Sequence, residues 1–124
     1  MRLLLDSHIF LWYTAPESPL RGDVISTLKQ ADEIYVSVAS LWELNLKAAK
    51  GKLVLREPLV HLVALYELSL LSIHSEHADA ILKMPQHHAD PFDHMLLAQA
   101  RVEGLALMTH DKMLAKYDVP LLLV

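Results

Sequence analysis

RLLLDSHIFLWY, residues 2–13, joins a continuous apolar run to an aspartate and then to a second apolar segment with a different period. Arg2 to Leu5 is typical of a short strand, and Asp6 follows it directly. Ser7 to Tyr13 carries its bulky apolar groups at helical spacing, and prolines follow shortly afterwards. The stretch therefore predicts a buried strand followed at once by a short helix.

The same alternation continues to the end of the chain. Further strands are predicted over residues 33–38, 70–73, 105–108 and 121–124. Further helices are predicted over residues 20–31, 41–51, 58–68, 75–85, 91–104 and 111–117. The strands are apolar throughout rather than on alternate residues, which indicates a parallel sheet covered on both faces. We expect an α/β fold, a three-layer α/β/α sandwich with a central, mainly parallel sheet, forming a single domain over residues 1–124.

The amino-acid composition excludes several classes of function for this protein. The 124 residues include no cysteine, which excludes disulfides and thiolate metal sites. No apolar run approaches the roughly 20 residues that span a bilayer, so we expect a cytoplasmic protein with no membrane partner. Hydrophobic residues make up 53% of the chain, which favours an oligomer or another protein partner. The net charge of −4 excludes nucleic-acid binding by overall charge, so any such binding requires a local basic cluster.

Acidic residues follow the predicted strands. Asp6 ends the first strand, Glu43 follows the second, and Asp111 follows the fourth, while Asp90 and Asp93 open a helix. The carboxyl ends of parallel strands meet at one edge of a sheet, where loops and helix N-termini gather. Clustered carboxylates repel one another unless a cation neutralises them. Oxygen ligands without cysteine favour Mg²⁺ or Mn²⁺, which can drive phosphodiester hydrolysis.

Basic residues adjoin this cluster. Glu43, Lys47 and Lys50 are spaced i, i+4, i+7 and share one helical face. We expect Lys47 or Lys50 to contact a nucleic-acid backbone near the metal.

Each acid also has a purely structural interpretation. Asp6, Asp90 and Asp111 could cap the helices that follow them, and Asp93 would favour a helix N-terminus simply as an acid. Ser40 is expected as a helix N-cap, with Glu43 as its capping-box partner. The alternative for Glu43 is an exposed ion pair with Lys47. It is less favoured that all of these acids lie at one sheet edge only because they are helix caps.

Histidines and aromatic residues are weaker signals. His87, His88 and His110 lack the spacing of a zinc helix and are expected in loops or on the surface, whereas His8 and His94 adjoin candidate ligands. Trp12, Trp42 and Tyr13 lie among leucines and are expected in the core, although base stacking is an alternative.

Four motifs together resemble one family. They are LLLDSH, SVASLWELNLKAAKGKL, HHADPFDHMLLAQA and LALMTHD. In this order, across nearly the whole chain, they resemble PIN-domain ribonucleases, the VapC-type toxins of bacterial toxin-antitoxin pairs. The resemblance implies an Mg²⁺- or Mn²⁺-dependent endoribonuclease that forms a homodimer and is neutralised by an antitoxin. By position its acidic quartet corresponds to Asp6, Glu43, Asp93 and Asp111.

Secondary candidates surround that quartet. Asp90 would orient the site, and Ser7, Ser40 and Thr109 would support the ligands. Phosphatases of the haloacid-dehalogenase kind would need an aspartate where His8 stands, and response-regulator receivers would need an acidic pair beside Asp6. The remaining alternative is a catalytically silent module that only captures a protein partner.

Overall fold

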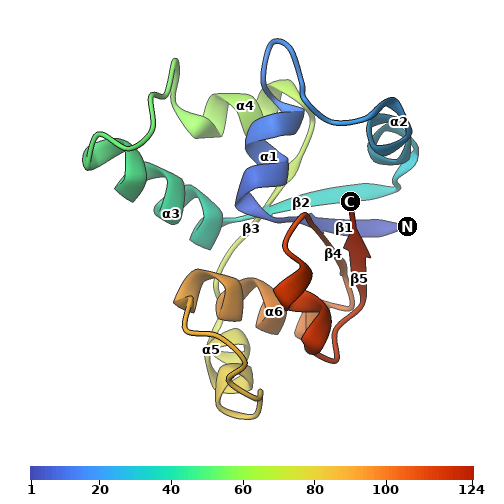
Figure 1. Ribbon diagram of the computed structural model, residues 1–124, viewed down its shortest axis with the longest axis vertical. Coiled ribbons are helices and arrows are strands. Elements are labelled where there is room, and N and C mark those ends of the chain that lie inside the picture. Colours follow the sequence, from blue (N-terminus) through green and yellow to red (C-terminus); the bar gives the residue numbers. More distant parts are fainter.

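Five strands form the central layer of the computed structural model, which describes all 124 residues. They pair in the order β3-β2-β1-β4-β5, and every pairing is parallel (Figure 1). The strands are β1 (Arg2–Leu5), β2 (Glu33–Ser37), β3 (Ser69–Leu71), β4 (Ala106–Thr109) and β5 (Leu121–Leu123). The predicted parallel sheet is confirmed.

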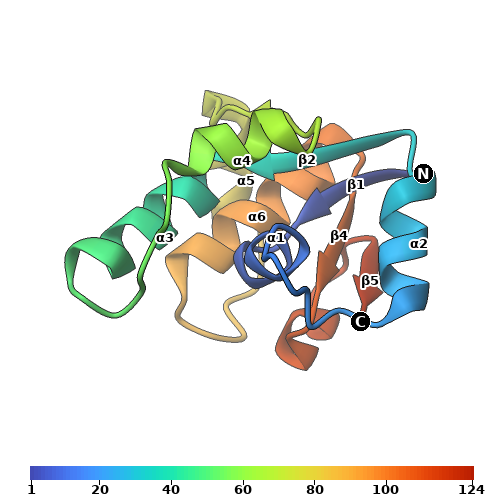
Figure 2. The same ribbon diagram turned by 90° about the horizontal axis from the view of Figure 1, so that it is seen from above.

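Helices cover both faces of the sheet, which confirms the three-layer sandwich. They are α1 (Ser7–Tyr13), α2 (Gly22–Gln30), α3 (Val38–Ala49), α4 (Leu59–Leu65), α5 (Ser75–Leu82) and α6 (Pro91–Glu103), with a 3₁₀ helix η1 (Lys112–Lys116). Helices α1, α2 and α4 lie on one face and α5 and α6 on the other, while α3 projects from the end of β2 (Figures 1 and 2). None of the helices has the length and apolarity needed to cross a bilayer.

The three leucines of β1 show why a continuous apolar run suits a central strand. Leu3, Leu4 and Leu5 are all fully buried. Because side chains alternate along a strand, Leu3 and Leu5 join the core cluster on one face and Leu4 joins the cluster on the other. Burying each leucine stabilises the fold by about 1.5 to 3 kcal/mol. Because the three leucines pack on both faces of the sheet, β1 contacts both helical layers.

The order of the strands creates a crevice beside β1. The chain passes from β1 outward to β2 and β3, then returns to place β4 on the other side of β1. Connections therefore leave the carboxyl ends of β1 and β4 in opposite directions, which is where open parallel sheets bind ligands. Asp6 follows β1 directly, and Asp111 lies two residues beyond Thr109, the end of β4.

The start of α3 differs from the prediction. The helix begins at Val38, and Ser37 is its N-cap, with its Oγ accepting a hydrogen bond from the Ala39 backbone N–H at 3.0 Å. Ser40 is therefore inside the helix, and Glu43 lies in the second turn, so the expected capping box does not form. Ser37 and Ser40 both lie near the end of β2, and serine is a favoured N-cap at either position. Ser37 is the cap because it keeps the extended backbone of β2.

The other helix ends follow local signals closely. Asp90 caps α6 through its side chain, Pro91 is the first helical residue, and Gly104 ends the helix with a left-handed φ of 68°. At α5 the expected cap Ser75 is the first helical residue and His74 is the N-cap. The predicted last helix forms as the 3₁₀ helix η1, capped by Asp111.

Candidate active site

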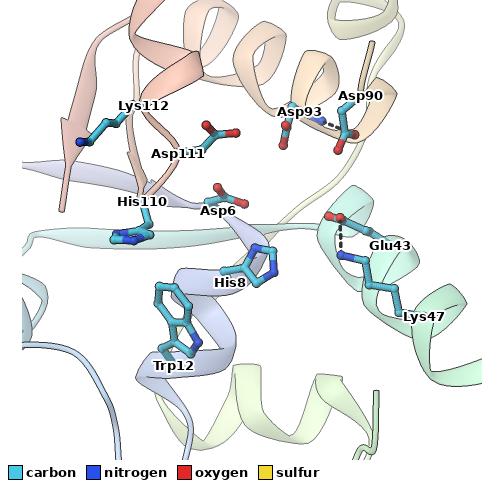
Figure 3. Close-up of a pocket in the computed structure, with 10 residues that line it drawn as sticks. All are labelled: Asp6, His8, Trp12, Glu43, Lys47, Asp90, Asp93, His110, Asp111 and Lys112. Carbon is cyan, nitrogen blue, oxygen red and sulfur yellow. Dashed lines mark hydrogen bonds and ion pairs between the residues drawn. The ribbon is translucent and has the colours of Figure 1, made fainter. Parts of the chain in front are cut away.

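A cavity of about 520 Å³ opens at the carboxyl ends of β1 and β4. Its walls come from one side of α1, the middle of α3, the start of α6 and the turn between β4 and η1 (Figure 3). Its lining residues are Asp6, Glu43, Asp90, Asp93, Asp111, Lys47, Lys112, His8, His110 and Trp12. Sequence positions more than 100 residues apart therefore meet here, and all five candidate carboxylates face one space.

Asp6 lies centrally among these side chains (Figure 3). Its side chain is buried and makes no capping hydrogen bond to α1; instead it accepts a hydrogen bond from the Thr109 hydroxyl at 2.6 Å. The interpretation of Asp6 as a side-chain cap is therefore wrong. Burial raises the pKa of Asp6, and the Thr109 hydrogen bond offsets part of that rise.

Glu43 is a second buried carboxylate, with 8% of its surface exposed. One oxygen accepts a hydrogen bond from the Ser7 hydroxyl at 2.7 Å, and the other accepts one from the Lys47 ammonium at 3.1 Å. The pair with Lys47 is thus present, but it accounts for only one of the two oxygens. Ser7, the first residue of α1, fixes the other and so couples α1 to α3.

Asp90 and Asp93 occupy the first turn of α6 in different ways. Asp90 caps the helix, accepting hydrogen bonds from the backbone N–H groups of Phe92 and Asp93 at 2.9 and 3.3 Å. Asp93 instead accepts a hydrogen bond from His88 at 3.1 Å. Burial raises the pKa of Asp93 to about 6, with His88 lowering it and the charges of Asp90 and Asp6 raising it.

Asp111 also caps the helix that follows it, since one oxygen accepts a hydrogen bond from the Met113 backbone N–H at 2.9 Å. Its own backbone N–H donates to the Thr109 hydroxyl oxygen at 3.1 Å. Thr109 therefore holds both Asp6 and Asp111, which makes it the support expected from the sequence. Ser40, by contrast, has a buried hydroxyl with no partner and contacts none of the carboxylates by hydrogen bonding.

The two expected lysines lie in different places. Lys47 lines the cavity, whereas Lys50 is exposed at the C-terminal end of α3 and is not part of the lining. Lys112, which was not among the residues predicted from the sequence, lines the opposite side (Figure 3). Its position directly after Asp111 was the available signal.

Aromatic side chains complete the wall. Trp12 contacts His8 and His110 with ring centroids 5.8 and 5.5 Å apart, and it packs partly against the core as expected. Trp12 and His110 also border an adjoining apolar cavity of about 340 Å³. The expectation of a buried Trp42 is wrong: its side chain is 58% exposed and meets Phe92 edge to face.

The chemistry of this donor set fits a hard divalent cation. Five carboxylates face two lysines in one cavity, and burial raises the pKa of two of the carboxylates, so their ionised forms are poorly solvated. A bound cation relieves that cost, and oxygen donors suit Mg²⁺ or Mn²⁺. No three of these side chains are arranged to hold an ion as they stand, so the carboxylates do not converge on a single point.

Comparisons with known proteins agree with this architecture. The model of the PIN domain family matches residues 3–120. Ribonuclease VapC22 of Mycobacterium tuberculosis is similar to this chain, with 28% identity covering 95% of this chain and 93% of the relative.

Solved structures share the fold. A chain of VapBC2 from Rickettsia felis, bound to a promoter DNA fragment, has a TM-score of 0.76 at 14% identity, covering 98% of each chain. A chain of FitAcB from Neisseria gonorrhoeae has a TM-score of 0.70 at 17% identity, covering 96% of this chain and 95% of the other. At these identities the structural likeness speaks for the fold, while the family model spans nearly all of the sequence: the chain belongs to the PIN domain family.

Proposed function

We propose that this protein is an Mg²⁺- or Mn²⁺-dependent endoribonuclease and the toxin of a toxin-antitoxin pair. The observation that carries the proposal is the meeting of Asp6, Glu43, Asp93 and Asp111 around one cavity, which Asp90 also lines. Burial raises the pKa of Asp6 and Asp93, and this is the environment in which a bound cation gains most from neutralising the site.

The carboxylates would have different roles in binding the ion. Asp6, Glu43 and Asp93 would be ligands, and Asp111 would place a water or a second ion. Ser7 and Thr109 hold Glu43 and Asp6 by hydrogen bonds of 2.7 and 2.6 Å, which keeps these carboxylates aimed at the cavity. A divalent ion bound there supplies an activated water and stabilises the leaving oxyanion.

The basic and aromatic walls suit a single-stranded RNA substrate. Lys47 and Lys112 border the acids and would contact phosphates on either side of the scissile bond. Trp12 and His110 separate the acidic cavity from the adjoining apolar one, which offers an aromatic surface to a neighbouring base. The name of the similar mycobacterial relative, a ribonuclease, supports RNA as the substrate.

Partners follow from the same relatives. Several solved structures that share the fold are VapBC assemblies or a toxin-antitoxin complex, which supports a cognate antitoxin as a protein partner. We also propose a homodimer. Large apolar side chains that are exposed on the single chain, Trp42 and Leu65 among them, are available to both kinds of interface. The protein would act in the cytoplasm, where its RNA substrate is found.

The test is cleavage of a synthetic RNA by the purified protein with Mg²⁺, with Mn²⁺ and with EDTA. We expect cleavage only when a divalent ion is present. Asp6→Asn should abolish cleavage, because it removes a ligand charge while keeping the shape of the side chain and an oxygen for the Thr109 hydrogen bond.

Asp79→Asn is the matched control, because Asp79 is exposed on α5 and outside the cavity. It should cleave as the wild type does. If the wild type, folded and able to bind Mn²⁺, cleaves no RNA with either ion, the nuclease proposal fails and the silent protein-binding module is the better description.

A further inference from the structure

The hydroxyl group of Tyr117 is the centre of a hydrogen-bond network outside the cavity. Its oxygen lies 3.0 Å from the His87 backbone nitrogen, 2.9 Å from His88 Nδ1 and 3.2 Å from His94 Nε2. Tyr117 follows η1, His94 lies in α6, and His87 and His88 lie in the loop between α5 and α6. One phenolic oxygen thus joins three separate segments.

Counting hydrogens assigns a direction to each bond. A phenol has one hydrogen to donate and two lone pairs to accept with. The His87 backbone N–H must donate, which uses one lone pair. Of the two imidazole nitrogens, one therefore donates to Tyr117 and the other accepts its hydrogen.

Asp93 decides which imidazole does which. His88 Nε2 lies 3.1 Å from the Asp93 carboxylate, and an ionised carboxylate can only accept. Neutral His88 therefore carries its hydrogen on Nε2, and its Nδ1 accepts the Tyr117 hydrogen. His94 must then donate to Tyr117 from Nε2. Every donor in this series of hydrogen bonds then has one acceptor, and the series ends at the Asp93 carboxylate.

We propose that Tyr117 is a positioning residue for Asp93, acting through His88. The inference rests on the proposed function for its purpose, because it gives Asp93 a fixed orientation toward the cation that the cavity would hold. His88 lies in a loop, in residues 83–90, without helical or strand hydrogen bonds to fix it. The Tyr117 hydroxyl is what holds its ring with Nε2 toward Asp93.

The ring of Tyr117 has a separate, packing role. The residue is 5% exposed and belongs to the core cluster on the α5 and α6 face of the sheet. Tyr117→Phe keeps that packing and removes only the hydroxyl. Tyr66→Phe is the matched control, because Tyr66 lies at the end of α4, packs against Tyr13 and makes no side-chain hydrogen bond.

The first measurement is the tautomer of each histidine by ¹⁵N NMR on the full chain without metal. At about pH 8, wild-type His88 and His94 should both carry hydrogen on Nε2. In Tyr117→Phe, the hydrogen on His88 Nε2 should exchange with water faster, because the ring is no longer held against Asp93, whereas Tyr66→Phe should match the wild type. A wild-type His88 protonated on Nδ1, or an unchanged exchange rate of the His88 Nε2 hydrogen in Tyr117→Phe, would overturn the proposal.

The second measurement is Mn²⁺ binding by titration. Loss of groups that orient metal ligands lowers affinity by about 10- to 100-fold, and Tyr117 acts at one remove, so we expect about a 10-fold loss. Tyr117→Phe in a His88→Ala background should cause no further loss, because the path to Asp93 is already cut. Additive losses would show that Tyr117 acts by another route and would overturn the proposal.

These results separate the two proposals. An unchanged exchange rate of the His88 Nε2 hydrogen in Tyr117→Phe refutes the positioning role even if the wild type cleaves RNA. A wild type that binds Mn²⁺ but cleaves no RNA refutes the nuclease proposal, while faster exchange of the His88 Nε2 hydrogen and loss of Mn²⁺ affinity in Tyr117→Phe would still support the positioning role.

Discussion

Replacing Asp93 by asparagine should stabilise the metal-free protein. The Asp93 side chain is 15% exposed, and burial raises its pKa from 3.8 to about 6. At about 1.4 kcal/mol for each tenfold change in an ionisation constant, this rise corresponds to roughly 3 kcal/mol of destabilisation once the carboxyl is ionised. Asparagine carries no charge and keeps an oxygen to accept the His88 hydrogen bond.

The sign of the effect depends on pH. A carboxyl whose pKa is higher in the folded than in the unfolded protein makes its full contribution to stability below about pH 4, and this contribution is lost as pH rises through about 6. The advantage of Asp93→Asn in the free energy of unfolding should therefore be near zero at pH 4. It should grow to about 3 kcal/mol at pH 8.

Urea denaturation in EDTA at the two pH values measures this difference. With a slope of about 1 to 3 kcal/mol per molar urea, the midpoint at pH 8 should rise by about 1 to 3 M. Mn²⁺ at about 1,000 times its Kd should reverse the order, since it adds about 4.1 kcal/mol to the wild type, which exceeds the gain from Asp93→Asn. An Asp93→Asn protein that is less stable than wild type at pH 8 without metal would refute the reasoning, as would a gain of equal size at pH 4.

Three further substitutions test other contacts. Lys47→Ala should weaken binding of a non-cleaved RNA and lower its salt-dependence slope by about 0.7, while Lys50→Ala, outside the cavity on the same helix, should change neither; equal effects in a filter-binding salt series would argue against the assigned geometry. Ser40→Ala removes a buried hydroxyl without a partner and should raise the free energy of unfolding by about 1 kcal/mol, and a loss in urea titration would mean that the hydroxyl has a partner. Gly104→Ala forces a side chain onto a left-handed backbone with φ of 68° and should lower thermal stability by about 1 to 2 kcal/mol, which calorimetry would contradict by finding no change.

Much of the fold was predictable because its signals are local. Continuous apolar runs such as Leu3 to Leu5 marked strands buried on both faces, and Asp90, Pro91 and Gly104 marked both ends of α6. The boundary between β2 and α3 was missed because Ser37 and Ser40 are equally good caps in sequence. The pairing of β2 with its neighbours decides where the extended backbone stops, because Ser37 is still paired with Leu71 of β3.

The candidate site was predictable in its members but not in their contacts. Parallel topology brings the ends of strands together, so the five acids could be grouped from their positions alone: Asp6, Glu43, Asp90, Asp93 and Asp111. Which acids are also caps could not be read from the sequence, because an aspartate before a helix has the same pattern either way. Asp111 caps its helix, whereas Asp6 bonds to Thr109 instead.

The sequence alone determined the order of strands and helices, the burial of the central strand and the set of acids at one edge, because periodicity, caps and turns are properties of neighbouring residues. The tertiary structure decided which side chains meet. The hydrogen bond between Thr109 and Asp6 spans 103 residues, and that between Tyr117 and His88 spans 29. Such contacts depend on the packing of whole layers against one another, and it is that packing that buries Asp6 and Asp93 and raises the pKa of each.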